Sequence, residues 1–135
     1  MNKLHQTIKH LWLNHPQHAL LGLTMIGVGT ILLVNRYYFF WPPFAVHILN
    51  DDLVGGTFIA VGIGLICWSV SNKNRISTNR NLLVASAVLL AAESTAEFCH
   101  AFISGRPHMV MAGFLELIIL LFDFLVISNS KKHNY

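Results

Sequence analysis

Charged residues are scarce in this chain of 135 residues: lysine and arginine number nine, aspartate and glutamate six, and together they make up 11% of the sequence. A soluble globular protein carries about a quarter, whereas 54% of this chain is hydrophobic. This excludes a disordered chain, a nucleic-acid-binding module with a basic face and an ordinary water-soluble enzyme. The composition indicates an integral membrane protein that is embedded in the lipid bilayer. We expect it to have no nucleic-acid partner.

Other features are missing as well. The alternating apolar and polar pattern of a membrane strand is absent, which favours helices. The chain has no P-loop, nucleophile elbow, zinc-protease or dinucleotide motif, so an enzyme is the less favoured interpretation. Its two cysteines, Cys67 and Cys99, form no C-x-x-C motif. They fall near opposite ends of two apolar stretches, too far apart for a disulfide bond.

Four apolar stretches account for most of the chain, and each is close to the ~20 residues that cross a hydrocarbon core about 30 Å thick. They cover residues 17–34, 53–70, 82–103 and 109–127. We therefore expect an all-α fold in which residues 1–135 form a single four-span membrane domain, a four-helix bundle.

The basic residues orient this bundle. Only Arg36 and Arg106 fall on one side of the four spans, and the other seven share the opposite side. By the positive-inside rule, both termini are predicted to be cytoplasmic, in a multi-pass protein of the cell membrane. The seven are Lys3, Lys9, Lys73, Arg75, Arg80, Lys131 and Lys132.

The connecting segments also have interpretable patterns. Residues 71–81 are polar and predict a loop in the cytoplasm, and residues 104–107 predict a tight turn that makes the last two spans an antiparallel hairpin. A short amphipathic helix on the membrane surface is predicted before the first span, with a frayed basic tail as the alternative. Its apolar residues would be Leu4, Ile8, Leu11 and Trp12. The histidines of this side, His15 and His18 among them, are expected to be solvated or near lipid headgroups.

The placement of the acidic residues is the most informative feature. No carboxylate lies in a predicted cytoplasmic segment, whereas all nine cations lie outside the apolar stretches. A charge at the centre of a bilayer costs about 3 kcal/mol on insertion scales, so acids inside spans require an explanation. Asp51 and Asp52 open the second span, where they could cap the helix. The other four are inside spans: Glu93 and Glu97 in the third, Glu116 and Asp123 in the fourth.

Helical spacing groups these acids into two stripes. Counted from the outer turn, Glu93 and Glu116 come out at the same depth, so the two stripes are predicted to face each other. His100 and His108 would lie above them, near an outer accessory group of His47, Asp51 and Asp52. One stripe consists of Ser86, Glu93, Glu97, His100 and Ser104, and the other of His108, Ala112, Glu116 and Asp123.

Small residues predict where helices approach closely. Gly22 and Gly29 form a notch on the first span. Two further small-residue ladders are predicted, Gly56, Ala60 and Gly64 on the second span and Ala87, Ala91 and Thr95 on the third.

Three interpretations of the acidic stripes remain open. In the first, Glu93, Glu97, Glu116 and Asp123 bind or translocate protons or a cation, since acids within spans are functional by default. In the second, they are neutral and hydrogen-bonded, and hold the bundle, a homo-oligomer or a larger membrane complex together in an interaction or accessory protein.

The third interpretation is a metal site. Glu97-x-x-His100 has the spacing of carboxylate-bridged metal bundles, and His108, Glu93 and Glu116 could complete the ligands. Such a donor set suits zinc, iron or manganese. A single E-x-x-H is a weak signal, and a di-metal bundle would carry two.

In size and span number the chain resembles small multidrug exporters, phage lysis or exclusion proteins and accessory subunits of membrane complexes, which implies a bacterial or phage origin. It shares no motif with any of them. An exporter normally carries its key acid in the first span, and residues 17–34 contain none.

Overall fold

The computed structural model describes residues 15–35, 43, 46, 52–71, 76–105 and 107–132. These form four long helices: α2 (Pro16–Val34), α4 (Asp52–Val70), α5 (Ile76–Ser104) and α6 (Pro107–Lys132). All four are long and apolar enough to cross a membrane. The prediction of four such helices is confirmed, and the described residues include no strand. The predicted amphipathic segment, His47 and Asp51 lie outside the described residues.

The helix ends follow from local sequence. Pro16 starts α2 and Pro107 starts α6, where the missing N–H of proline costs nothing. Gly105 ends α5 with a φ of +64°, a left-handed conformation that favours glycine. This glycine lets the chain reverse between α5 and α6, as predicted for the turn at residues 104–107.

Both C-terminal helices are longer than their apolar stretches. Helix α5 begins at Ile76 rather than at residue 82, and α6 continues to Lys132 rather than ending at residue 127. The expectation of a loop over residues 71–81 was therefore wrong for its second half. Hydropathy marks only the part of a helix that suits lipid, and a helix can continue with polar residues beyond it.

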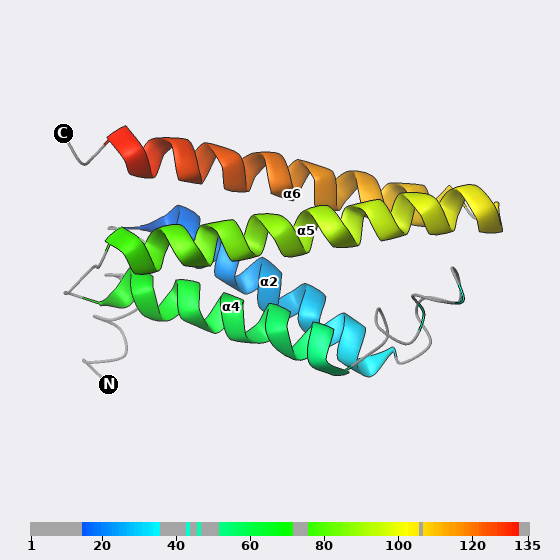
Figure 1. Cartoon of the computed structure of the whole chain (residues 1–135), viewed down its shortest axis with the longest axis horizontal. Helices are drawn as coiled ribbons and strands as arrows, with labels where there is room; N and C mark the ends of the chain where they lie inside the picture. Colours follow the sequence, from blue (N-terminus) through cyan, green and yellow to red (C-terminus); the bar gives the residue numbers. More distant parts are fainter. Residues whose placement is uncertain are drawn as a thin grey trace.

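The helices pack as two antiparallel pairs, α2 with α4 and α5 with α6 (Figure 1). The starts of α2 and α5 and the ends of α4 and α6 lie at one end of the bundle, called the Pro16 end below (Figure 1). At the opposite end, called the Gly105 end, α5 and α6 extend past α2 and α4. The difference follows from length, since the 19 residues of α2 span about 28 Å and the 29 of α5 about 43 Å.

The α2–α4 pair is held by close backbone contact. A Cβ added at Gly22 would lie 2.7 Å from the carbonyl oxygen of Gly62, and one at Gly29 would lie 2.6 Å from that of Gly55. Both glycine pairs repeat at seven residues, two turns of each helix.

The predicted ladder of Gly56, Ala60 and Gly64 is therefore not the face that contacts α2. A Cβ at Gly56 would meet nothing within 4 Å, Ala60 is exposed, and Gly64 lies against Leu82 of α5. Of the glycines on α4, only Gly55 and Gly62 have the seven-residue spacing of Gly22 and Gly29.

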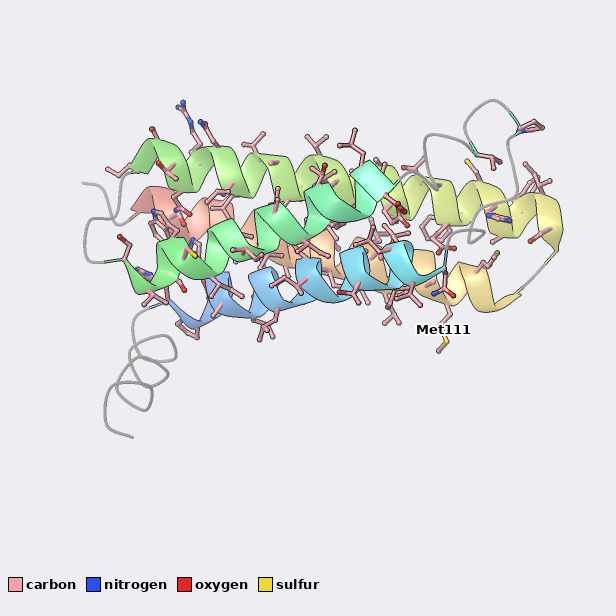
Figure 2. All side chains as sticks on the ribbon, turned by 90° about the horizontal axis from the view of Figure 1, so that it is seen from below. Met111 is labelled. Atoms are coloured by element: carbon pink, nitrogen blue, oxygen red, sulfur yellow. The ribbon has the colours of Figure 1, made fainter. Side chains whose placement is uncertain are left out.

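The apolar residues are distributed on both the inside and the outside of the bundle. Leu21, Met25, Phe58 and Leu90 are buried in the core. The exterior is also apolar. Met111, which points away from the bundle in Figure 2, is 69% exposed. Other exposed residues are Leu53, Val88, Phe102, Phe114, Leu121, Phe124 and Leu125. An exterior of this kind is unsuited to water and suits lipid.

Candidate functional site

Buried polar side chains follow the contact between α5 and α6 along its length. On α5 they recur at Asn79, Ser86, Glu93 and His100, every seventh residue, with Glu97 one turn from Glu93. On α6 polar residues recur at Ser130, Asp123 and Glu116, again every seventh residue. Asp123 is buried, and the other two are partly buried. These eight residues are called the polar seam below. Because both helices keep the same repeat, each of the three polar residues on α6 faces a polar residue on α5: Ser130 faces Asn79, Asp123 faces Ser86 and Glu116 faces Glu93.

The best-defined contact of the polar seam joins Ser86 and Asp123. Both are fully buried, with 0% of either residue exposed. The Ser86 hydroxyl donates to Asp123 Oδ2 over 2.6 Å, and the same hydroxyl lies 2.9 Å from the carbonyl oxygen of Leu83. A hydroxyl carries a single proton, so only one of the two acceptors can receive it at a time.

The contact nearest the Pro16 end joins Asn79 and Ser130. The Asn79 amide nitrogen donates to the Ser130 hydroxyl over 3.4 Å, a long and therefore weak hydrogen bond. The seven-residue spacing from Ser86 leads directly back to Asn79, but this contact was not predicted, because the polar residues 71–81 indicated a loop.

Three glutamates gather in the middle of the polar seam. Glu93 and Glu97 are 3% and 1% exposed, and Glu116 lies near enough to interact electrostatically with both. The predicted juxtaposition of Glu93 and Glu116 is thus present. The nearest described lysine or arginine along α5 is Arg80, thirteen residues or about 20 Å from Glu93. Glu93 and Glu116 therefore have no lysine or arginine partner among the described residues.

A small residue on α6 makes room for these glutamates. A Cβ added at Gly113 would lie 3.1 Å from Cβ of Glu97 and 3.4 Å from the ring of Phe98. The backbone of α6 also accepts a hydrogen bond here, from the Ser94 hydroxyl to the Gly113 carbonyl oxygen over 2.9 Å. This link, not anticipated from sequence, fixes the level at which the two helices meet.

Of the remaining predicted site residues, the structure describes the side chains of two, His100 and Asp52. His100 is fully buried on the same face of α5, towards the Gly105 end, and Asp52 is exposed on the first turn of α4. His47, Asp51 and the side chain of His108 lie outside the described residues.

The described part of the chain gives the predicted metal centre no support. No three of its histidine, cysteine, aspartate or glutamate side chains come together in a way that could hold a metal ion. Glu93, Glu97, His100 and Glu116 share a seam without converging on one point.

The Pro16 end holds a second polar cluster, which corrects the expectation of a solvated His18. This histidine is 5% exposed, and its ring centroid lies 4.7 Å from that of Trp68. His15 packs on the same indole at 5.0 Å, and the Asn79 side chain is within reach of His18. The close approach at Gly22 and Gly62 brings the first turn of α2 against the last turn of α4, which buries His18.

Two acid oxygens have no hydrogen-bond partner among the described residues. These are Asp123 Oδ1 and Glu116 Oε2, both buried. A buried carboxylate oxygen without a donor is costly, at roughly 2–7 kcal/mol for a polar group transferred without a compensating bond.

Comparison of the chain with protein-family models, with characterised proteins and with solved structures finds no match. Function must therefore be inferred from the polar seam itself.

Proposed function

We propose that the chain is a multi-pass membrane protein that binds protons in the polar seam and transfers them along it. Its termini lie on the cytoplasmic side of the cell membrane. The apolar exterior of all four helices and the seven basic residues on one side of the spans support this placement.

The observation that carries the proposal is the geometry around Ser86. If its hydroxyl donates to the Leu83 carbonyl, the 2.6 Å contact with Asp123 needs a proton from the acid. A neutral Asp123 supplies that proton and leaves no buried charge. If the acid loses it, the Ser86 hydroxyl can turn towards Asp123 and stabilise the carboxylate. Ser86 and Asp123 thus provide two hydrogen-bonding arrangements that differ by one proton.

The glutamate cluster favours protons over larger cations. Glu93 and Glu116 interact with neighbouring carboxyl groups and with no lysine or arginine among the described residues, so their charge is most simply balanced by protons. A metal ion would require several converging donors, which the described residues do not provide.

One observation favours a second candidate, an interaction or accessory protein in which the polar seam is structural. Leu83, Leu90, Leu120 and Val126 are buried in the same core cluster, and by their spacing lie between the polar contacts. Alternating polar and apolar layers fix helix register, as single buried polar residues do in coiled coils. On this alternative, the helices align with each other, with a second copy or with a larger membrane complex, and no proton moves.

Proton flux separates the two candidates. The full chain is reconstituted into vesicles that contain a pH-sensitive dye, and a potassium gradient with valinomycin drives proton entry. The variant Glu93→Gln/Glu116→Gln keeps hydrogen-bonding side chains but removes two titrating groups. Asp52→Asn is the matched control, since Asp52 is exposed and outside the polar seam.

We expect dye acidification with the wild type and with Asp52→Asn, and a loss of at least tenfold in the glutamine variant. Flux equal to protein-free vesicles for the wild type would favour the structural candidate. Flux that survives in the glutamine variant would contradict the assignment to these glutamates.

A further inference from the structure

A groove of about 580 Å³ runs along the outside of the bundle between α4 and α5. Apolar side chains form most of its surface, and Arg80 and Asn81 lie at its Pro16 end. Thr57 lies towards the Gly105 end, where its hydroxyl donates to the Leu53 carbonyl oxygen. It is lined by Thr57 of α4 and by Arg80, Asn81, Val84, Ala85, Val88 and Leu89 of α5. Such a groove, polar at one end and apolar along its length, suits an amphipathic molecule.

The polar end of the groove carries a positive charge. Arg80 is exposed and forms no ion pair among the described residues. It lies in the second turn of α5, near a helix N-terminus whose dipole already disfavours a cation. No acidic residue occurs in residues 71–81 or after Asp123, so the sequence nearby offers no carboxylate. An anion from outside the chain is therefore the natural partner of Arg80.

The depth of the groove matches one leaflet of a bilayer. From Arg80 to Leu89, α5 rises by about 14 Å, close to half of a hydrocarbon core roughly 30 Å thick. Because α5 is about 13 Å longer than that core, its first turns can lie at the level of the headgroups, with Arg80 among them.

We propose that this groove binds one anionic phospholipid of the cytoplasmic leaflet. The lipid phosphate contacts Arg80 and Asn81, and one acyl chain lies against Val84 and Val88. This inference rests on the membrane placement given under Proposed function, and it is independent of the proton chemistry of the polar seam. A zwitterionic lipid fits less well, because its ammonium group would meet a basic surface without a carboxylate.

Native mass spectrometry of the purified full chain in detergent micelles tests the site. Phosphatidylglycerol and phosphatidylcholine with identical acyl chains are titrated separately, and the dissociation constant of the first bound lipid is compared. Arg80→Gln removes the charge and Arg80→Lys retains it. Ala85→Phe fills the groove while leaving Arg80 in place. Ala92→Phe is the matched control, since Ala92 is an exposed alanine of α5 outside the groove.

We expect the wild type, Arg80→Lys and Ala92→Phe to prefer phosphatidylglycerol. Arg80→Gln should bind it about fivefold more weakly, the factor that corresponds to about 1 kcal/mol for one basic side chain. Ala85→Phe should weaken both lipids by a similar factor. A preference retained in Arg80→Gln would overturn the proposal, and so would wild-type affinity for both lipids in Ala85→Phe. Displacement of the lipid by millimolar inorganic phosphate would also overturn it, since the acyl chain would then contribute nothing.

This readout is separable from that of the proposed function. Selective lipid binding by a chain that shows no proton flux would refute the proton pathway alone. Proton flux without lipid selectivity would refute only the proposal that the groove binds an anionic phospholipid.

Discussion

The two helical pairs are held together by different kinds of contact: close backbone approach at glycines in α2 and α4, and polar side chains in α5 and α6. In α2 and α4, glycines bring the backbones together at Gly22 and Gly62 and again at Gly29 and Gly55. In α5 and α6, polar side chains meet at the same seven-residue interval, as at Ser86 and Asp123. Glycine contacts rely on van der Waals packing and weak Cα–H···O bonds, and bury no group that needs a partner. Polar contacts must be satisfied or they destabilise the pair.

The two pairs also differ in their content of charged residues. Helix α2 contains no aspartate, glutamate, lysine or arginine, and α4 contains only Asp52 at its start. Four acids are instead concentrated in α5 and α6. The α2–α4 pair is thus suited to be a static scaffold, and the acids inside the spans belong to the α5–α6 pair.

The largest effect is expected from a methyl group at a glycine contact. In Gly62→Ala the new Cβ would lie 2.6 Å from the Gly22 carbonyl oxygen, and backbone cannot move aside as a flexible side chain can. We expect the free energy of unfolding, measured by titration with dodecyl sulfate in mixed micelles, to fall by about 1–3 kcal/mol.

Two glycines of the same helices serve as controls. A Cβ at Gly27 or Gly56 meets nothing within 4 Å, so alanine there should leave stability unchanged or raise it slightly. Equal losses in Gly62→Ala and Gly56→Ala would show that the backbone contact does not hold the pair.

A smaller effect is expected from the Ser86–Asp123 hydrogen bond. A double-mutant cycle with Ser86→Ala and Asp123→Asn should give a coupling energy of about 0.6–1.7 kcal/mol, between the mean and the largest value found for hydrogen bonds between membrane helices. Additive effects of the two substitutions in the same micelle titration would mean that the 2.6 Å contact contributes nothing.

The glycine of the polar pair should tolerate alanine better than the glycines of α2 and α4. In Gly113→Ala the new Cβ would meet Cβ of Glu97 at 3.1 Å, and a shift of a few tenths of an ångström relieves the contact. We expect a stability change below about 1 kcal/mol, offset in part by the higher helix propensity of alanine. A loss as large as that of Gly62→Ala would remove the distinction between the two pairs.

The smallest effect is expected at the Pro16 end of the polar seam. The Asn79–Ser130 bond is 3.4 Å long, so Ser130→Ala should cost no more than about 0.5 kcal/mol. If Ser130→Ala costs more than the Ser86–Asp123 coupling energy, the strongest polar contact of the seam lies at the Pro16 end instead.

Much of the architecture was predictable because lipid imposes simple rules. Span length, the turn at Gly105 and the facing of Glu93 and Glu116 follow from hydropathy, glycine chemistry and helical spacing. The start of α5 did not follow, since residues 76–81 are polar and hydropathy cannot distinguish a polar helical turn from a loop.

The glycine face of α4 was missed for a different reason. Gly56, Ala60 and Gly64 satisfy the familiar four-residue spacing, whereas the pair that forms, Gly55 and Gly62, is chosen by its match to Gly22 and Gly29 on the partner helix. The burial of His18 depends on the same pairing. To predict the glycine face of α4 and the burial of His18, one must know which face of α2 packs against which face of α4. This depends on the sequences of both helices together.

Infrared titration of the carboxyl groups tests the central claim most directly. In bilayers, the C=O stretch of protonated acids is followed against pH for the wild type, for Glu93→Gln/Glu116→Gln and for Asp52→Asn. Proton binding in the polar seam predicts a protonated-carboxyl band that persists at neutral pH in the wild type and in Asp52→Asn, and is strongly reduced in the glutamine variant. Identical bands in all three proteins would contradict it.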